Sequence, residues 1–274
     1  MIDDTNYTEQ TEPDYQVRSY NWKTAIGLQQ VDGIRPSDYL VEIANKNIEG
    51  QISLDEAEQR LAEYYEHKPA GSKDENRSRE ADIVSLHIAK ILASWTFKLS
   101  PLEIFSIHRQ LFQGVFDHAG KIRDCNLSKR EWVLGGASVV YDDFRTARAS
   151  LDYDFDQEKE FDYSMLDDRQ AAEHIAKFIS GLWQIHPFRE GNTRLVAVFT
   201  IKYLRKFGYD LANDTFEKNA WYFRNALVRA NFSNRREGVS ETYIYLNRFF
   251  GNLLLGETNE LKNRDLHASQ KASA

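Results

Sequence analysis

Nine consecutive residues combine the side chains that phosphate chemistry uses. They run from His186 to Arg194 and read His-Pro-Phe-Arg-Glu-Gly-Asn-Thr-Arg. The imidazole of His186 has an ordinary pKa near neutrality, which suits a general base. The carboxylate of Glu190 suits a hard divalent cation. With the arginine, these groups indicate a site for nucleotide phosphates.

The elements that must position these residues predict an anion site. A helical pattern ends at Ile185, and Pro187 discourages its continuation. Gly191 permits a tight turn before a second helix that begins at Asn192. The start of that helix offers unpaired backbone N–H groups and the positive end of a dipole. Arg194 in the first turn is unfavourable for the helix alone, and it makes sense where an anion binds.

A purely structural interpretation of the same residues stays open. His186 and Phe188 could be buried residues at a helix end, and Arg194 could be an ordinary surface charge. A lone histidine would favour that interpretation. Nine consecutive residues that each suit one phosphate site favour the functional one.

Composition narrows the class of protein. The chain has 274 residues, a formal net charge of −7 and a pI of about 5.6, which disfavours generic nucleic-acid binding. The single cysteine, Cys125, excludes an internal disulfide and a cysteine-based zinc cluster. The acidic start lacks the features of a secretory signal, and the longest apolar stretches, such as 195–201, are too short to span a membrane. We therefore expect a cytoplasmic protein with no membrane contact.

Apolar residues at helical spacing predict an all-α fold. Residues 130–141, with two glycines between apolar arms, predict a β-hairpin that packs against the helical body. We expect a frayed start over 1–20, a loop over 68–76 and a solvated acidic connector over 152–168. Helices are expected in two stretches of 36–66 and over 80–95, 101–112, 168–185, 192–207, 219–230 and 240–255.

The segment 186–194 resembles the signature loop of the Fic (Fido domain) family, whose pattern is H-P-F-x-[D/E]-G-N-G-R-x-x-R. Residues 107–112 and 119–129 are similar to the family's early helix and to the lead into its flap. The resemblance implies an all-α Fic-type core with a β-hairpin flap and a small N-terminal helical extension. The implied division is an extension over 1–75, a leading helix over 76–99, a Fic domain over 100–250 and a polar tail over 251–274.

The resemblance also implies an activity, that of a protein adenylyltransferase. Such an enzyme transfers AMP from ATP to a Tyr, Thr or Ser hydroxyl of a target protein. His186 would be the general base, Glu190 would hold Mg²⁺ against the phosphates, and Arg194 would hold the leaving pyrophosphate. Phe188 would anchor the loop in the core. The phosphate oxygens would meet the amides of Gly191, Asn192 and Thr193, with the Asn192 side chain orienting the α-phosphate.

Partners follow from the same resemblance. The expected partners are ATP and a protein substrate with a hydroxyl side chain, together with a homodimer mate and an inhibitory protein as candidates. The hairpin over 129–141 would align the target segment by strand addition. The residues expected to dock the target are Lys129, Trp132, Val133 and Leu134.

Two positions depart from the family pattern. Thr193 replaces a glycine, and Ala197 replaces the final arginine. Thr193 with Glu190 and Gly191 favours AMP transfer over the phosphate transfer of the family's Doc branch, which has lysine at position 193. The missing arginine is the usual partner of an inhibitory glutamate, so we expect no strong glutamate clamp on this loop.

Two glutamates are candidates for such an inhibitory role. Glu237 lies in Ser233–Gly238, which fits the inhibitory pattern [S/T]-x-x-x-E-[G/N], and we expect an ordinary charged loop there. Glu80 has Asn76 and Ala81 in the flanking positions of that pattern, and we expect it on an ordinary packing helix.

Three other functions remain as alternatives. The same loop could transfer another phosphate moiety, such as UMP or phosphate. A non-catalytic adaptor could keep the loop for nucleotide binding only, which the departures at Thr193 and Ala197 leave open. A metal-dependent hydrolase built on His186 and Glu190 lacks further ligands in the sequence.

Overall fold

The computed structural model describes residues 13–68, 71–209, 211 and 213–268. These residues form ten α-helices, and their only β-pairing is an isolated bridge between Asn234 and Val239, so the predicted all-α fold is confirmed. The helices are α1 (Tyr15–Gly27), α2 (Asp38–Ile48), α3 (Leu54–Glu66), α4 (Lys73–Ala93), α5 (Pro101–Phe112), α6 (Ala147–Glu160), α7 (Asp168–Ile185), α8 (Asn192–Lys206), α9 (Thr215–Ala230) and α10 (Ile244–Leu254).

Local capping signals fix where several helices begin. At the start of α3, the Glu56 amide donates to the Ser53 hydroxyl at 3.1 Å, and the Ser53 amide donates to the Glu56 carboxylate at 2.7 Å. This reciprocal pair is a capping box, in which Ser53 and Glu56 each satisfy a backbone N–H of the other. Equivalent boxes start α4 at Ser72 and α7 at Asp167.

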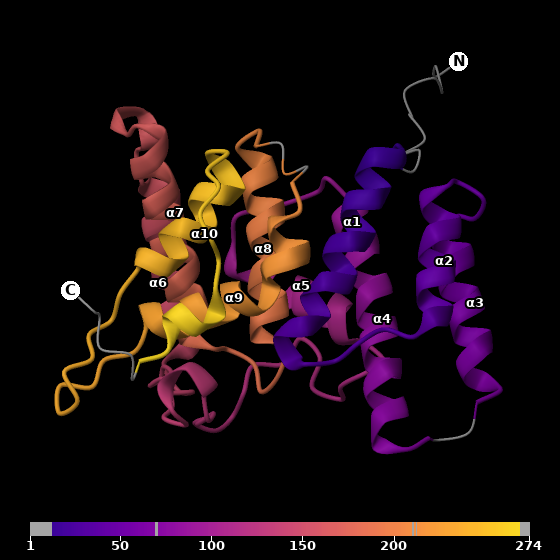
Figure 1. Cartoon of the computed structure of the whole chain (residues 1–274), viewed down its shortest axis with the longest axis horizontal. Helices are drawn as coiled ribbons and strands as arrows, with labels where there is room; N and C mark the ends of the chain where they lie inside the picture. The colour runs from indigo at the N-terminus through magenta and orange to yellow at the C-terminus, as the bar shows by residue number, and fades with distance from the viewer. Residues whose placement is uncertain (1–12, 69–70, 210, 212, 269–274) are drawn as a thin grey trace, which may run out of the picture.

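Helix α8 forms the centre of the fold (Figure 1). All its residues from Asn192 to Leu204 are buried, and it packs against α4, α5 and α7. Helix α1 packs against α4 and α9, while the short 3₁₀ helix η1 (Leu28–Asp32) contacts α8 and α9. The N-terminal helix therefore belongs to the same core as the helices that carry the signature loop.

Three expected irregular segments are helical instead. Residues 15–20 are not frayed, because Asp14 caps α1 and Trp22 is buried with its indole N–H donating to Asn47. Residues 73–76 of the expected loop over 68–76 belong to α4, which has Ser72 as its N-cap, and residues 69–70 lie outside the described part of the chain. The acidic stretch 152–160 belongs to α6, whose buried apolar residues recur every four positions between charged ones.

The predicted β-hairpin over 130–141 is wrong in its secondary structure. Residues Trp132–Leu134 form a 3₁₀ turn, and Gly135 and Gly136 both have positive φ. Two backbone bonds link Glu131 to the segment after the turn: its amide donates to the Ala137 carbonyl at 3.0 Å, and its carbonyl accepts from the Gly136 amide at 2.9 Å. Burial explains the difference, because the adjacent residues Val133 and Leu134 are both buried, whereas a ladder would direct successive side chains to opposite faces.

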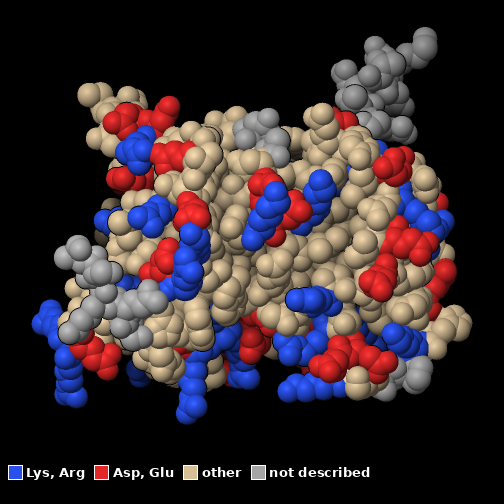
Figure 2. Space-filling view, in the orientation of Figure 1, with Lys and Arg blue, Asp and Glu red and all other residues tan. Residues whose placement is uncertain are grey.

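Charges of both signs are mixed over the face shown in Figure 2. No helix within the described ranges combines the length and the apolar character needed to cross a bilayer.

Candidate active site

The signature loop joins the end of α7 to the start of α8, and His186 sits at the junction. Its backbone adopts the left-handed conformation, with φ 51° and ψ 57°. It is the one non-glycine residue with positive φ in the described part of the chain. Such a conformation costs free energy in a β-carbon residue, so surrounding contacts must hold it.

The contacts of the His186 imidazole define its chemistry. The Nδ1 atom lies 3.1 Å from the carbonyl oxygen of Trp183, which can only accept, so Nδ1 carries the proton and Nε2 keeps its lone pair. The Tyr141 ring stacks on the imidazole with centroids 3.9 Å apart. Burial first, and then the positive charges of Lys129, Arg123 and Arg224, lower the pKa of His186 to about 3. The residue is therefore a neutral proton acceptor at pH 7 rather than a group poised near neutrality.

Phe188 places its ring in the core behind the loop. It is fully buried and stacks on His108 with centroids 3.7 Å apart. The Gly120 amide donates to His108 Nδ1 at 2.8 Å, so His108 Nε2 carries a proton and donates to the Glu190 carbonyl at 3.0 Å. His108 thus braces the loop from α5, a role that the sequence did not reveal.

The turn before α8 is shaped by Gly191 and Asn192. Gly191 has φ 76°, and a β-carbon there would lie 2.2 Å from the Phe112 ring, so only glycine fits. The Asn192 side chain accepts from the Phe188 amide at 3.1 Å and donates to the Phe188 carbonyl at 2.7 Å. The observed contacts of the Asn192 amide are within the loop, and a contact with the α-phosphate stays a prediction.

Thr193, which departs from the family pattern, has a partner of its own. Its hydroxyl oxygen accepts a hydrogen bond from the indole N–H of Trp183 at 3.0 Å. Both side chains line the same cavity as His186. The extra side chain is therefore accommodated between α7 and α8, where it satisfies a buried donor.

Arg194 is held by three residues from the N-terminal third of the chain, which we call the arginine clasp: Gln29, Asp32 and Glu80. Arg194 is 2% exposed, and its Nη2 donates to Glu80 at 2.8 Å while its Nη1 donates to Gln29 at 3.1 Å. Its Nε lies 2.9 Å from an oxygen of Asp32. The guanidinium also lies 4.9 Å from the centre of the Phe112 ring.

The clasp corrects one expectation about inhibitory glutamates. We expected Glu80 to lack an arginine partner on this loop, because Ala197 replaces the usual one, yet Glu80 pairs with Arg194. Helix α4 projects Glu80 toward the first turn of α8, which the sequence alone could not show. Glu237 lies in the exposed turn between Asn234 and Val239, as expected of a charged loop.

Glu190 is the candidate Mg²⁺ ligand. It is exposed and lines the cavity, and no ion pair engages its carboxylate among the described residues. Mg²⁺ is commonly bound by one or two carboxylates plus substrate phosphates, so this position fits the ion. No group of three or more His, Cys, Asp or Glu in the described segments could hold a metal by itself.

The four residues expected to dock a target fall into two groups. Lys129 and Trp132 are exposed, and Lys129 Nζ lies 3.9 Å from the carboxylate of Asp32. Val133 and Leu134 are buried, because the 3₁₀ turn directs them into the core. In this structure the two buried side chains do not face a partner.

The signature loop and its neighbours enclose a cavity of about 180 Å³. His186, Glu190, Gly191, Asn192 and Thr193 line it. Asp32, residues 127–129 and Arg224 form other parts of its wall. Sites for drug-sized ligands usually span about 300–1,000 Å³, so a nucleotide would require these walls to move.

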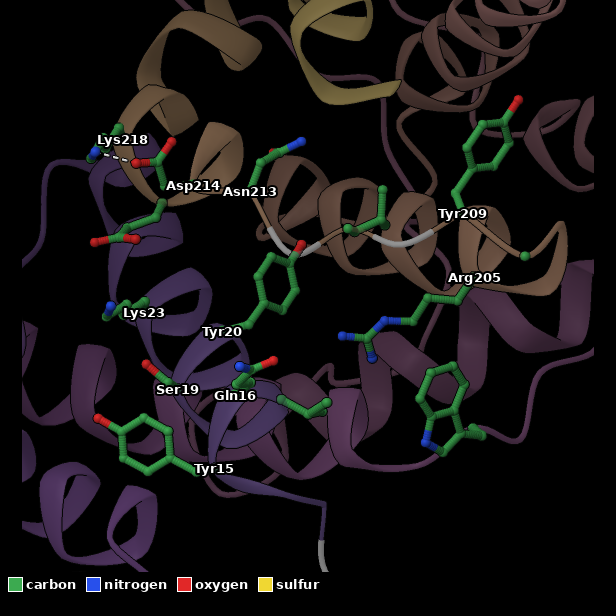
Figure 3. Close-up of a pocket in the computed structure, with 15 residues that line it drawn as sticks. Tyr15, Gln16, Ser19, Tyr20, Lys23, Arg205, Tyr209, Asn213, Asp214 and Lys218 are labelled. Atoms are coloured by element: carbon green, nitrogen blue, oxygen red, sulfur yellow. Dashed lines mark hydrogen bonds and ion pairs between the residues drawn. The ribbon is translucent and has the colours of Figure 1, made fainter. Parts of the chain in front are cut away.

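A larger cavity of about 960 Å³ lies at the other end of α8, between α1 and the start of α9 (Figure 3). Tyr20, Arg205 and Asn213 line it, and Lys218 pairs with Asp214 at its rim. None of the signature residues lines this cavity. Its size therefore says nothing about the proposed chemistry.

The residues around the loop that the sequence did not single out share one property: each supports a signature residue, and all but Trp183 do so from a segment distant in the chain. Two of them, His108 and Arg123, lie within the stretches that resemble the family, which was the signal available. Tyr141 lies at the end of the expected hairpin over 129–141, and the others gave no signal: Gln29, Asp32 and Trp183.

Comparison with known proteins supports the resemblance. Residues 98–204 match the Fic/DOC family. The predicted resemblance to the Fic family is therefore confirmed over this part of the chain. That part contains α5, α6, α7, the whole signature loop and all but the last two residues of α8.

Two curated proteins resemble the chain at low identity. One is the probable protein adenylyltransferase Fic of Escherichia coli K12, 26% identical over 135 residues that cover 47% of this chain and 64% of that protein. The other is the protein adenylyltransferase VbhT of Bartonella schoenbuchensis, 27% identical over 192 residues that cover 62% of this chain and 38% of that protein. The chain thus matches less than two thirds of either relative.

Solved structures share the fold. The N-terminal FIC domain of Bep8 from Bartonella sp. 1-1C has a TM-score of 0.53 at 17% identity, covering 69% of this chain and 88% of that one. BepC from Bartonella tribocorum, solved with bound AMPPNP, has a TM-score of 0.52 at 16% identity, covering 68% and 90%.

Proposed function

We propose that this chain is a protein adenylyltransferase that transfers AMP from ATP to a Tyr, Thr or Ser hydroxyl of a target protein. The observation that carries the proposal is the state of His186. Its proton is held on Nδ1 by the Trp183 carbonyl, which leaves the Nε2 lone pair available beside the start of α8 and Glu190. A fixed, neutral base next to an anion site is what activation of a hydroxyl requires.

In the proposed reaction His186 Nε2 takes the proton of the target hydroxyl, and the hydroxyl oxygen attacks the α-phosphorus. A new P–O bond forms, the bond from the α-phosphorus to the oxygen bridging the β-phosphate breaks, and pyrophosphate leaves with that oxygen. The amides of Gly191, Asn192 and Thr193 would bind phosphate oxygens at the positive end of α8. Phosphate charge near the imidazole would raise the low pKa of His186 toward the range of an effective base.

Mg²⁺ is part of the proposal because Glu190 presents an unpaired carboxylate to the cavity. When bound there with the nucleotide, the ion would neutralise phosphate charge. Glu190 would hold it, and the phosphates themselves would complete its coordination.

We also propose that the arginine clasp holds the site in a repressed state. Arg194 would serve the leaving pyrophosphate only after Asp32 and Glu80 release it, since all three of its nitrogens now face clasp residues. Glu80 is thus the proposed inhibitory residue, and its partner is Arg194 instead of an arginine at position 197. Movement of Asp32 would also enlarge the cavity that it partly lines.

The remaining assignments stay part of the same proposal. The Fic domain would span 100–250 behind the leading helix 76–99, with the extension 1–75 and the tail 251–274 outside it. The exposed Lys129 and Trp132 would face the target. A cytoplasmic location, a homodimer and a separate inhibitory protein are further expectations of this assignment.

A labelling experiment tests the function. Purified protein and its His186→Ala variant are incubated with Mg²⁺, cell lysate and ATP labelled at the α- or the γ-phosphate. We expect protein-bound label from the α-position only, and its loss in His186→Ala. The control is His67→Ala, which removes an exposed histidine on α3's end and should keep the label.

The same experiment is repeated with Glu80→Ala, so that a clasped enzyme is not mistaken for an inactive one. Label from both positions would point to phosphoryl or whole-nucleotide transfer. Binding of AMPPNP without any label, in both backgrounds, would favour the alternative of a nucleotide-binding adaptor.

A further inference from the structure

Arg123 holds together three segments that meet behind the signature loop. It lies in the loop after α5 and is 2% exposed. Its Nε donates to the His186 carbonyl at 2.7 Å, and its Nη2 donates to the carbonyls of Asp142 and Ile185. Its Nη1 donates to the Cys125 carbonyl at 2.7 Å and to the Asn126 side chain at 3.3 Å.

The partners of this buried charge are unusual. No carboxylate lies within ion-pair distance of Arg123 among the described residues, and almost all its partners are backbone carbonyls. Two of those carbonyls, from Ile185 and His186, belong to the last turn of α7. The C-terminal carbonyls of a helix carry partial negative charge and lack partners within the helix, so a cation is favoured there.

The bonds to His186 act on a strained residue. His186 is held at positive φ, and the Arg123 amide donates to the next carbonyl, that of Pro187, at 2.9 Å. Arg123 therefore binds the carbonyl oxygens of both His186 and Pro187. Because the orientation of the His186 peptide sets where its imidazole points, Arg123 bears directly on the geometry of the proposed base.

We propose that Arg123 is a positioning residue for His186: its guanidinium fork fixes the left-handed turn that directs the imidazole into the cavity. By binding Asp142 and Cys125 as well, it ties this turn to both ends of the flap segment. The proposal deepens the proposed function, since it concerns the same site. Arg123 itself touches no reacting atom.

The fork geometry separates Arg123 from other residues of similar size. Arginine presents five N–H donors in a rigid plane, whereas lysine has three donors on one atom and glutamine has two with no charge. A lysine at position 123 would keep the charge and lose the simultaneous bonds to the three segments. A glutamine would lose both.

The charge of Arg123 has a separate effect on His186. The groups that face the imidazole are Arg123, Lys129 and Arg224, with the Tyr141 ring stacked on it. The three positive charges lower the pKa of His186 in addition to burial. Removal of one charge should therefore raise the pKa, while replacement of arginine by lysine should leave it nearly unchanged.

The test compares Arg123→Lys, Arg123→Gln and Arg123→Ala with the control Arg148→Gln, which removes an exposed arginine paired with Asp152 on α6. We expect kcat to fall at least about tenfold in all three Arg123 variants, since the base is misplaced by a fraction of an ångström or more. KM for ATP should change little. Low, non-denaturing guanidinium should restore part of the activity of Arg123→Ala only.

A second readout does not require activity. The imidazole signal of His186 is followed by NMR against pH without nucleotide, and it is assigned with His186→Ala. We expect protonation to begin at higher pH in Arg123→Gln than in the wild type, and at an unchanged pH in Arg123→Lys, with its chemical shift moved in both. Unchanged shifts in both variants, or a KM effect with normal kcat, would overturn the proposal. If the wild type transfers no AMP, the NMR result still decides whether Arg123 positions His186.

Discussion

Release of Arg194 from its clasp should activate nucleotide binding. The perturbations are Glu80→Ala and Asp32→Asn, which each remove one carboxylate from the guanidinium. If phosphate and clasp compete for the same arginine, weakening the clasp raises the fraction of molecules that can bind nucleotide. The apparent Kd falls by the same factor.

The structure sets the magnitude. The contact of Arg194 with Glu80 is a hydrogen bond between charged groups, a class that contributes about 1.5–3 kcal/mol, and its contact with Asp32 is an ion pair. The Glu80 and Asp32 side chains are 24% and 25% exposed, so solvent screens them partly and the lower end applies. About 1.4 kcal/mol corresponds to a tenfold gain in AMPPNP affinity for either variant. The two gains should not add fully, because both carboxylates share Arg194.

Titration calorimetry with AMPPNP and Mg²⁺ measures the affinity, and urea unfolding measures the stability. Each variant should lose about 1–2 kcal/mol of unfolding free energy without nucleotide, since the same contacts stabilise the free protein. Glu58→Gln, which weakens the Lys90 pair between α3 and α4, should lose stability without gaining affinity. An affinity that stays equal or falls in both clasp variants would refute the reasoning and make the clasp purely structural.

Three further predictions concern single contacts. The pKa of His186 in the fold, about 3, lies below its unfolded value of 6.5, so the unfolded chain binds the extra proton and stability falls as pH drops from about 6.5 toward 3. Between pH 7 and pH 5, urea unfolding should therefore show a smaller loss of unfolding free energy in His186→Asn than in the wild type. The difference should be up to about 1.4 kcal/mol per pH unit. Glu131→Ala should cost about 3–5 kcal/mol in the same assay at pH 7, because Arg224 stays buried without its ion pair, and a double variant with Arg224→Met should recover much of that loss. Thr193→Val should lose about 1–3 kcal/mol of unfolding free energy, because the Trp183 N–H is left without an acceptor. Thr193→Ser keeps the hydroxyl and should be close to the wild type. Thermal unfolding of both variants measures the difference.

Much of the helical framework could be predicted from local signals. The box at Ser53 and Glu56, Pro101 at the start of α5 and the apolar spacing of α7 are short-range properties, and the structure contains all three. The prediction of a solvated connector over the α6 region was wrong. Acidic residues outnumber the apolar ones there, but burial of the apolar residues against α7 stabilises the helix. The hairpin prediction was wrong because residues 132–134 form a 3₁₀ turn, which Gly135 ends, instead of continuing a strand.

The sequence by itself determined the chemical identity of the candidate site. Nine adjacent residues carry the base, the carboxylate and the helix start, and adjacency along the chain places them together in almost any fold. Tertiary structure decided their state. Arg194 meets Asp32 and Glu80, and His186 meets Arg123, across more than sixty intervening positions in the nearer case. Such contacts depend on how helices pack and not on local spacing, so only the folded chain shows that the arginine is engaged and the histidine is held neutral.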